Sequence, residues 1–139
     1  FLGNSVLGEW CNLGADTNNS NLKNTYGTVQ AFSYATDVQV DTGLQFCGLV
    51  MGDHSKSGIN TMFNTGTVVG VAANVFGGGF PPKHVPSFVW GGAEGFSEHT
   101  LSKALETAQR VMERRHVPLT VIDRAILEHV HQATARQRG

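Results

Sequence analysis

Several sequence features that mark common protein classes are rare or absent in this chain. It contains only two cysteines, Cys11 and Cys47, without the spacing of a metal or redox motif, which argues against a disulfide scaffold and favours a reducing cytoplasm. Charged residues make up 15% of the chain and the net charge is −1, so no basic surface for nucleic acid is predicted. No apolar run approaches the ~20 residues that cross a bilayer. We therefore expect a cytoplasmic protein that binds neither nucleic acid nor membranes.

A six-residue repeat runs through the first part of the chain. From Met51 to Phe80 the first position of each hexapeptide is usually large and apolar, and the fifth is small. Residues 1–18 follow the same pattern in phase, which gives eight hexapeptides in all. Such a period is typical of a triangular solenoid, in which three hexapeptides complete a turn of about 18 residues. The large first positions are Met51, Phe63, Val69 and Val75, and the small fifth positions are Ser55, Thr61, Thr67, Ala73 and Gly79.

The repeat is interrupted and then stops. Two β-rich runs, at residues 26–32 and 38–46, predict a hairpin-like loop inserted at about residues 19–50. The repeat is predicted to end at Phe80, because the prolines that follow cannot donate to a central strand. Residues 81–95 are then expected to form a linker, and the hexapeptide-repeat domain to span residues 1–80.

Residues 96–139 predict two α-helices. Ser97 is the expected N-cap of the first, which has apolar residues at helical spacing. Thr120 and Asp123 have the spacing of a capping box at the start of the second. Residues 132–139 are polar and are expected to fray. One apolar side of the second helix is predicted to consist of Ile122, Ile126 and Val130.

Two stretches of the repeat resemble a known enzyme family. The run from Phe1 to Thr17 resembles the acetyltransferase half of bifunctional glucosamine-1-phosphate N-acetyltransferase/N-acetylglucosamine-1-phosphate uridyltransferases, in particular their Bacteroidetes-type relatives. The run from Leu49 to Thr61 is similar to the point where that family returns to its repeat. The resemblance implies a mainly β protein with a left-handed parallel β-helix. Handedness comes from the resemblance alone, because ordinary β-crossovers are right-handed.

The same resemblance implies a function and a set of site residues. It implies a homotrimer that transfers acetyl from acetyl-coenzyme A to an amino-sugar 1-phosphate such as glucosamine-1-phosphate. The histidine base would lie upstream of Phe1, and Mg²⁺ would serve only a preceding nucleotidyltransferase domain, so this chain alone is expected to be inactive or nearly so. The substrate-binding residues would be Phe1, Asn12 and Asn21, and the acetyl-coenzyme A-binding residues would be Ala15, Leu22, Ile59 and Gly77.

Two classes of function remain open at this point. The first is the acetyltransferase. The second is a non-catalytic module that only trimerises or regulates a sugar-1-phosphate nucleotidyltransferase. Leu22 stands where the family has tyrosine, and this difference favours the module.

The other residues with chemical potential have ordinary explanations. His54, in the corner-like sequence Gly-Asp-His-Ser, is interpreted as a solvated histidine rather than a base. Cys11 falls at a small fifth position and is interpreted as a packing residue rather than a nucleophile. His129 and His131 lack the i,i+4 spacing of helical metal ligands, so no metal site is predicted. Residues 77–79, three glycines, predict a tight corner rather than a phosphate loop.

Overall fold

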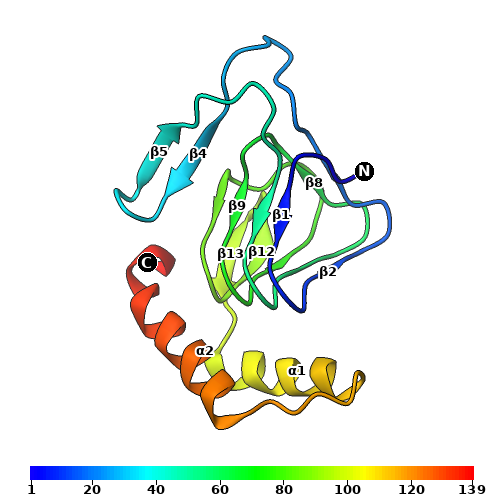
Figure 1. Cartoon of the computed structure of the whole chain (residues 1–139), viewed down its shortest axis with the longest axis vertical. Coiled ribbons are helices and arrows are strands. Elements are labelled where there is room, and N and C mark those ends of the chain that lie inside the picture. The colour runs from blue at the N-terminus through cyan, green and yellow to red at the C-terminus, as the bar shows by residue number, and fades with distance from the viewer.

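The computed structural model describes residues 1–139 (Figure 1). The chain is mainly short strands in parallel sheets, followed by two α-helices, in agreement with the broad class predicted from the sequence. The strands are β1 (Val6–Leu7), β2 (Asn12–Leu13), β3 (Asn18–Asn19), β4 (Gln30–Ser33), β5 (Val38–Asp41), β6 (Val50–Met51), β7 (Lys56–Ser57), β8 (Met62–Phe63), β9 (Val68–Val69), β10 (Asn74–Val75), β11 (His84–Val85), β12 (Val89–Gly92) and β13 (Gly95–Glu98). The helices are α1 (Leu101–Glu113), α2 (Val121–Ala133) and a 3₁₀ helix at Ala135–Arg138.

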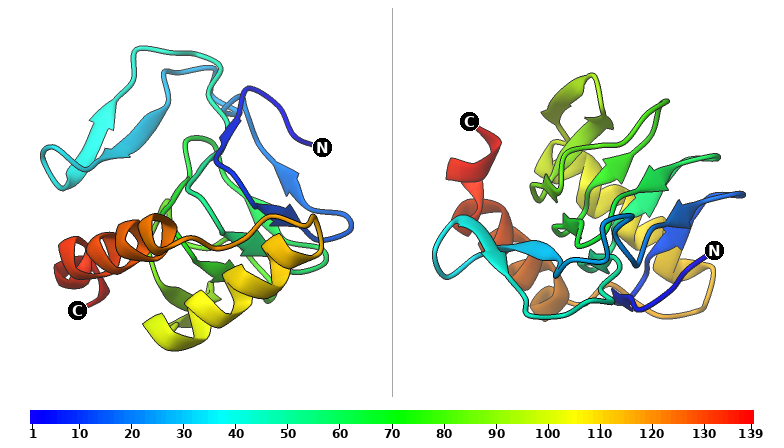
Figure 2. Two further views of the ribbon diagram at one scale, coloured as in Figure 1. Left: turned by 60° about the horizontal axis from the view of Figure 1, so that its bottom comes forward. Right: turned by 90° about the horizontal axis from the view of Figure 1, so that it is seen from above.

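The chain visits three parallel sheets in turn. Sheet A has the order β1-β6-β9-β11, sheet B the order β2-β7-β10-β12-β13, and sheet C consists of β3 and β8. Val50 pairs with Val68, and Lys56 pairs with Asn74, so these partners are 18 residues apart. Only β12 and β13 pair antiparallel within these sheets. The strands of successive layers therefore lie one above another, as Figure 2 shows from two sides.

The repeat pattern is reflected in which side chains are buried. Every large first-position side chain from Met51 to Val75 is at most 2% exposed. The small fifth positions Ser55, Thr67 and Ala73 are 0% exposed, which lets the facing sheets approach closely. Burial of one large apolar side chain stabilises the fold by about 1.5–3 kcal/mol. The main core consists of Leu49, Met51, Phe63, Val69, Ala73, Val75, Val85 and Val89.

The fourth residue of the hexapeptide forms the corner between sheets. Trp10, His54, Ala72 and Phe88 have φ angles of 54° to 63°, in the left-handed region that non-glycine residues rarely adopt. Backbone hydrogen bonds between layers hold them there, for example from His54 N to Glu9 O (2.9 Å) and from Phe88 N to Val71 O (2.8 Å). We call the stack of these four residues, between sheets A and B, the first corner.

The inserted segment forms an antiparallel hairpin, as its two β-rich runs suggest. Strands β4 and β5 pair from Gln30 with Asp41 to Ser33 with Val38. The hairpin projects beyond the parallel sheets (Figure 1). It contacts sheet A where the Phe32 ring stacks on the His84 ring, with centroids 3.6 Å apart.

The segment expected to be a linker instead contains strands. Strand β11 pairs with β9, and β12 pairs with β10, so the parallel stacking continues past Phe80. The prolines are tolerated because they lie outside β11, which is the last strand of sheet A. The prediction of a linker at residues 81–95 is therefore wrong.

The first helix begins later than predicted. Residues 95–98 form β13, which pairs with β12, and α1 begins after an N-cap at Thr100. Ser97 is thus a strand residue, paired with Trp90, rather than an N-cap. The local capping signal failed because hairpin pairing supplies more backbone hydrogen bonds than a single cap. The capping box of Thr120 and Asp123 on α2 is confirmed.

Both helices pack on the first corner. A second apolar cluster consists of Ala72, Phe88, Ala104, Leu105, Ala108 and Leu127. Of the expected apolar side of α2, only Val130 packs against this cluster, since Ile122 is 71% and Ile126 is 56% exposed. The end of the chain is not frayed either: the Arg138 side chain is 8% exposed, and it donates to Ser87 O and His131 O.

Candidate functional site

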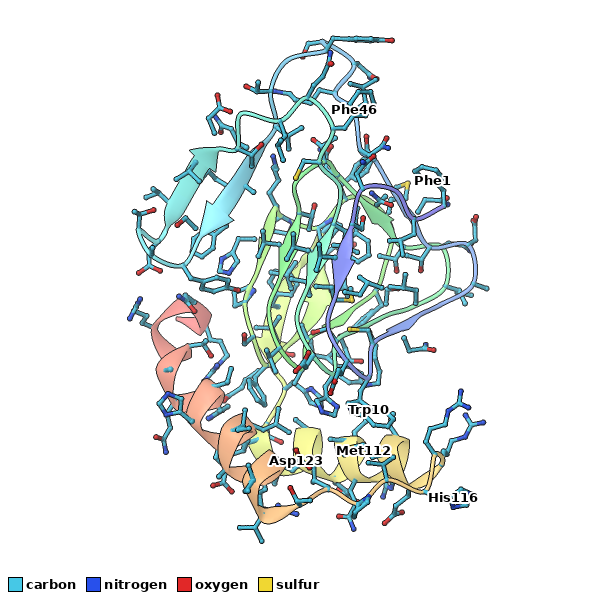
Figure 3. All side chains as sticks on the ribbon, in the orientation of Figure 1. Phe1, Trp10, Phe46, Met112, His116 and Asp123 are labelled. Carbon is cyan, nitrogen blue, oxygen red and sulfur yellow. The ribbon has the colours of Figure 1, made fainter.

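The residues assigned to ligands from the sequence fall into three separate places. Phe1 and Asn21 flank Gly3: a Cβ atom on Gly3 would lie 2.5 Å from Phe1 Cζ and 3.0 Å from Asn21 Nδ2. Leu22 is close by in the chain and forms an antiparallel bridge with Phe46. Figure 3 shows Phe1 and Phe46 at the end of the sheets opposite to the helices. Within one chain, these three residues do not meet the other predicted site residues.

Ala15, Ile59 and Gly77 are stacked at the corner that follows sheet B. Strand β2 pairs with β7, and β7 with β10, and each of the three residues lies three positions after a paired strand residue. Asn60 N donates to Ala15 O at 2.9 Å, which joins two of these layers directly. All three residues are exposed, Ile59 to 70%. We call this stack the second-corner column.

Asn12 lines a groove between sheet B and the end of α1. The groove has a volume of about 550 Å³, within the usual range of ligand sites. Three lining residues are cationic and none is acidic, and arginine pairs are well suited to bind phosphate or carboxylate. We call it the basic groove; its lining is Trp10, Cys11, Asn12, Lys56, Val111, Arg114 and Arg115.

Two titratable groups of the basic groove are partly buried. Lys56 Nζ donates to His54 O at 3.0 Å, and burial lowers the pKa of the ammonium group. Burial also raises the pKa of the Cys11 thiol, and the side chain packs against the main core. A protonated thiol is a poor nucleophile, so Cys11 is a packing residue of the groove wall.

A smaller cavity shares Trp10 with the basic groove. Its volume is about 160 Å³, and it lies between the first corner and the two helices. Figure 3 shows Trp10 beside Met112 of α1, with Asp123 at the start of α2. We call it the acidic cavity; its lining is Glu9, Trp10, Asp53, His54, Met112, Asp123, Ile126 and Leu127.

His54 is not the solvated histidine that the sequence predicted. It is only 9% exposed, because α1 and α2 cover the first corner. Its Nδ1 atom is buried without a hydrogen-bond partner. Burial lowers the pKa of the imidazole, with the nearby ammonium of Lys56 acting in the same direction. His54 is therefore a neutral imidazole at neutral pH.

Sequence reasoning did not identify Trp10, Arg114 or Arg115 as site residues. Trp10 occupies the same repeat position as His54, which was a usable signal for a shared corner. The two arginines follow the apolar stripe of α1, where basic residues commonly stabilise a helix C-terminus. Only the docking of α1 against sheet B places them beside Asn12.

Burial of histidines predicts a pH-dependent stability. Burial lowers the pKa values of His54 and His84 below 6.5 in the folded chain. The unfolded chain therefore binds more protons than the folded chain as the pH drops through about 6.5. The free energy of unfolding should fall over this step, which can be followed from about pH 8 to about pH 5. His54→Asn removes one of the two imidazoles and should therefore reduce this fall. Asparagine is chosen because it tolerates the φ of 63° at this corner. Urea unfolding across this pH range measures the free energy of unfolding of the unmodified protein and of His54→Asn. Equal pH dependence in these two proteins would contradict the prediction.

Comparison with known proteins does not assign the chain to a family. No protein-family model matches the sequence, and neither does any curated protein. No helix is long and apolar enough to cross a membrane. No three His, Cys, Asp and Glu side chains are grouped so that they could hold a metal ion.

Proposed function

We propose that the protein containing this chain transfers an acetyl group from acetyl-coenzyme A to the amine of an amino-sugar 1-phosphate such as glucosamine-1-phosphate. In this proposal the parallel sheets are a left-handed β-helix that assembles as a homotrimer. A nucleotidyltransferase domain that uses Mg²⁺ would belong to the same protein. The spacing of 18 residues between parallel partners supports the β-helix, because three hexapeptides complete one turn of such a solenoid.

The second-corner column is the observation on which the proposed activity depends most. The resemblance assigns Ala15, Ile59 and Gly77 to coenzyme A, although they are far apart in the sequence. Parallel pairing stacks them in one exposed column. A long, flexible pantetheine chain would bind along such a column, one layer after another.

The basic groove suits the proposed acceptor. Its cations Lys56, Arg114 and Arg115 would bind the phosphate group of the sugar, and Asn12 offers both a donor and an acceptor for hydroxyl groups. Phe1 and Asn21 would reach the ligand from a neighbouring copy, since the resemblance places the reaction between subunits.

The proposed reaction is a direct transfer. A base removes a proton from the acceptor amine, and the amine attacks the thioester carbonyl carbon. The carbon–sulfur bond then breaks, and coenzyme A leaves as the thiol after it takes up a proton. The resemblance places the histidine base upstream of Phe1; such a base contributes about 10²–10⁴ in rate.

Ala15→Trp tests the proposal. The new side chain would cover the column without entering the core, because Ala15 is exposed. In protein that includes the residues before Phe1, we expect release of coenzyme A thiol with glucosamine-1-phosphate to fall at least about tenfold, equivalent to about 1.4 kcal/mol of binding. Ala35→Trp, in the exposed hairpin turn, is the matched control and should retain full activity.

A second candidate is a non-catalytic trimerisation or regulatory module of a sugar-1-phosphate nucleotidyltransferase. The observation that favours it is the Ile59 side chain, which is 70% exposed in the column where coenzyme A would need small neighbours. The two candidates differ in one experiment. Trimers in sedimentation analysis with no acetyl transfer by the unmodified protein would support the module and contradict the acetyltransferase.

A further inference from the structure

The acidic cavity has a charge opposite to that of the basic groove. Three carboxylates line it, from Glu9, Asp53 and Asp123, and no lysine or arginine does. It is formed by segments that are distant in the sequence: Glu9 and Asp53 each precede a residue of the first corner, and Asp123 belongs to α2. The cavity therefore depends on the docking of the helices.

The carboxylates retain free acceptor capacity. Asp53 accepts a bond from Glu9 N through Oδ1 (2.8 Å). Asp123 accepts bonds from Thr120 N and Oγ1 through Oδ2, both at 2.9 Å. Each of these two aspartates uses only one oxygen in these bonds, so the other can accept a bond from a ligand.

His54 is the least satisfied polar side chain of the cavity. It is 9% exposed, and its Nδ1 atom is buried without a partner. An unpaired buried polar group destabilises the fold. The corner backbone fixes its position, because His54 N donates to Glu9 O at 2.9 Å. A neutral imidazole on this wall adds a polar group to the carboxylates without adding positive charge.

The remaining lining is apolar and aromatic. Met112, Ile126 and Leu127 would contact carbon atoms of a ligand, and the Trp10 ring can attract a cation through its π face. The space is partly open to solvent and has a volume of about 160 Å³. The space thus fits a ligand of a few carbon atoms with one charged group.

We propose that the acidic cavity binds a small organic ammonium cation, with its charge beside the carboxylates of Glu9, Asp53 and Asp123 and its carbon atoms against Met112, Ile126 and Leu127. The site is separate from the second-corner column and does not depend on acetyl transfer. Anions are rejected here by the carboxylates and are accepted in the basic groove. The ammonium of Lys56, which is close enough to affect the His54 imidazole, limits the affinity.

Binding of n-butylammonium, followed by NMR, tests this proposal on the full chain. The indole N–H signal of Trp10 and the ring C–H signals of His54 should shift on titration. The Trp90 indole, which is not part of the cavity lining and is 46% exposed, serves as an internal reference. A ligand of this size should bind with a Kd on the order of 1 mM. Butyrate and n-butanol, of the same length, should not shift these signals.

Glu9→Gln is the decisive variant, because it removes one charge from the cavity at an exposed side chain, with little effect on folding. We expect the Kd for n-butylammonium to rise several-fold. Glu94→Gln, an exposed carboxylate outside the cavity, should leave the Kd unchanged. Equal binding of n-butanol, binding of butyrate at the same signals, no saturable shift, or an unchanged Kd in Glu9→Gln would each overturn the proposal.

Discussion

Phe88→Ala is expected to lower the free energy of unfolding by about 3–5 kcal/mol, the usual cost of removing a buried aromatic ring. Phe88 is 0% exposed and belongs to the cluster that joins the first corner to both helices. Its ring also contacts the His131 ring edge-to-face, with centroids 5.0 Å apart. Alanine keeps the Cβ atom, so the corner φ of 56° costs the same in both proteins.

Urea unfolding followed by circular dichroism measures this loss, and hydrogen exchange locates it. Amides of α1 and α2 should exchange faster, since their contact with the sheets depends on Phe88. Phe80→Ala is the matched control: Phe80 is 52% exposed, and its loss should change stability by no more than about 0.5 kcal/mol. A loss below about 1 kcal/mol in Phe88→Ala would mean that the helices are held by other contacts.

Gly14→Ala is expected to destabilise the fold by about 1–3 kcal/mol or more, through overpacking. A Cβ atom on Gly14 would lie 2.5 Å from Gly58 C and 2.7 Å from both Gly58 O and Ile59 N. These are backbone atoms of the next layer, so no side-chain rotation can relieve the clash. The layer that contains β2 and the layer that contains β7 would have to separate near Gly14. They would then lose hydrogen bonds such as that from Gly14 N to Ser57 O (2.9 Å).

Gly78→Ala is the matched control for this substitution. A Cβ atom on Gly78 would meet no atom within 4 Å, and its φ is outside the left-handed region. Its stability should change by no more than about 0.5 kcal/mol. Both variants are compared by urea unfolding at the same pH. If the two variants lose equal stability, the close contact between Gly14 and Gly58 does not limit the side chain at position 14.

The repeat could be predicted from sequence because its signal is local. Met51, Phe63 and Val69 recur at the first position of a hexapeptide, and all are buried in the core. Each hexapeptide needs only one large side chain that points into the core and one small side chain. The pattern can therefore be recognised without knowing which segments lie next to it in the fold. The hairpin and the capping box of α2 were predictable for the same reason, since both depend on residues adjacent in the chain.

The ends of elements were less predictable. Prolines suggested that the repeat stops at Phe80, but strand β11 lies at the edge of sheet A, where no further bonds are required. Ile122, Ile126 and Val130 suggested a buried face of α2, yet Leu127 is its buried residue, and only Val130 of the three packs on the second cluster. In both cases the answer depends on which surface meets the segment, and periodicity contains no information about that surface.

Local residue patterns were enough to predict the short strands of a six-residue repeat, the inserted hairpin and two helices near the C-terminal end. The surroundings of Trp10 and His54 depend instead on how the helices pack against the sheets. Docking of α1 and α2 on the first corner buries His54, encloses the acidic cavity and places Arg114 and Arg115 beside Asn12. The physical reason is that local propensity and periodicity act within a few residues. The charge and burial of a site depend instead on contacts between segments that are far apart in the chain.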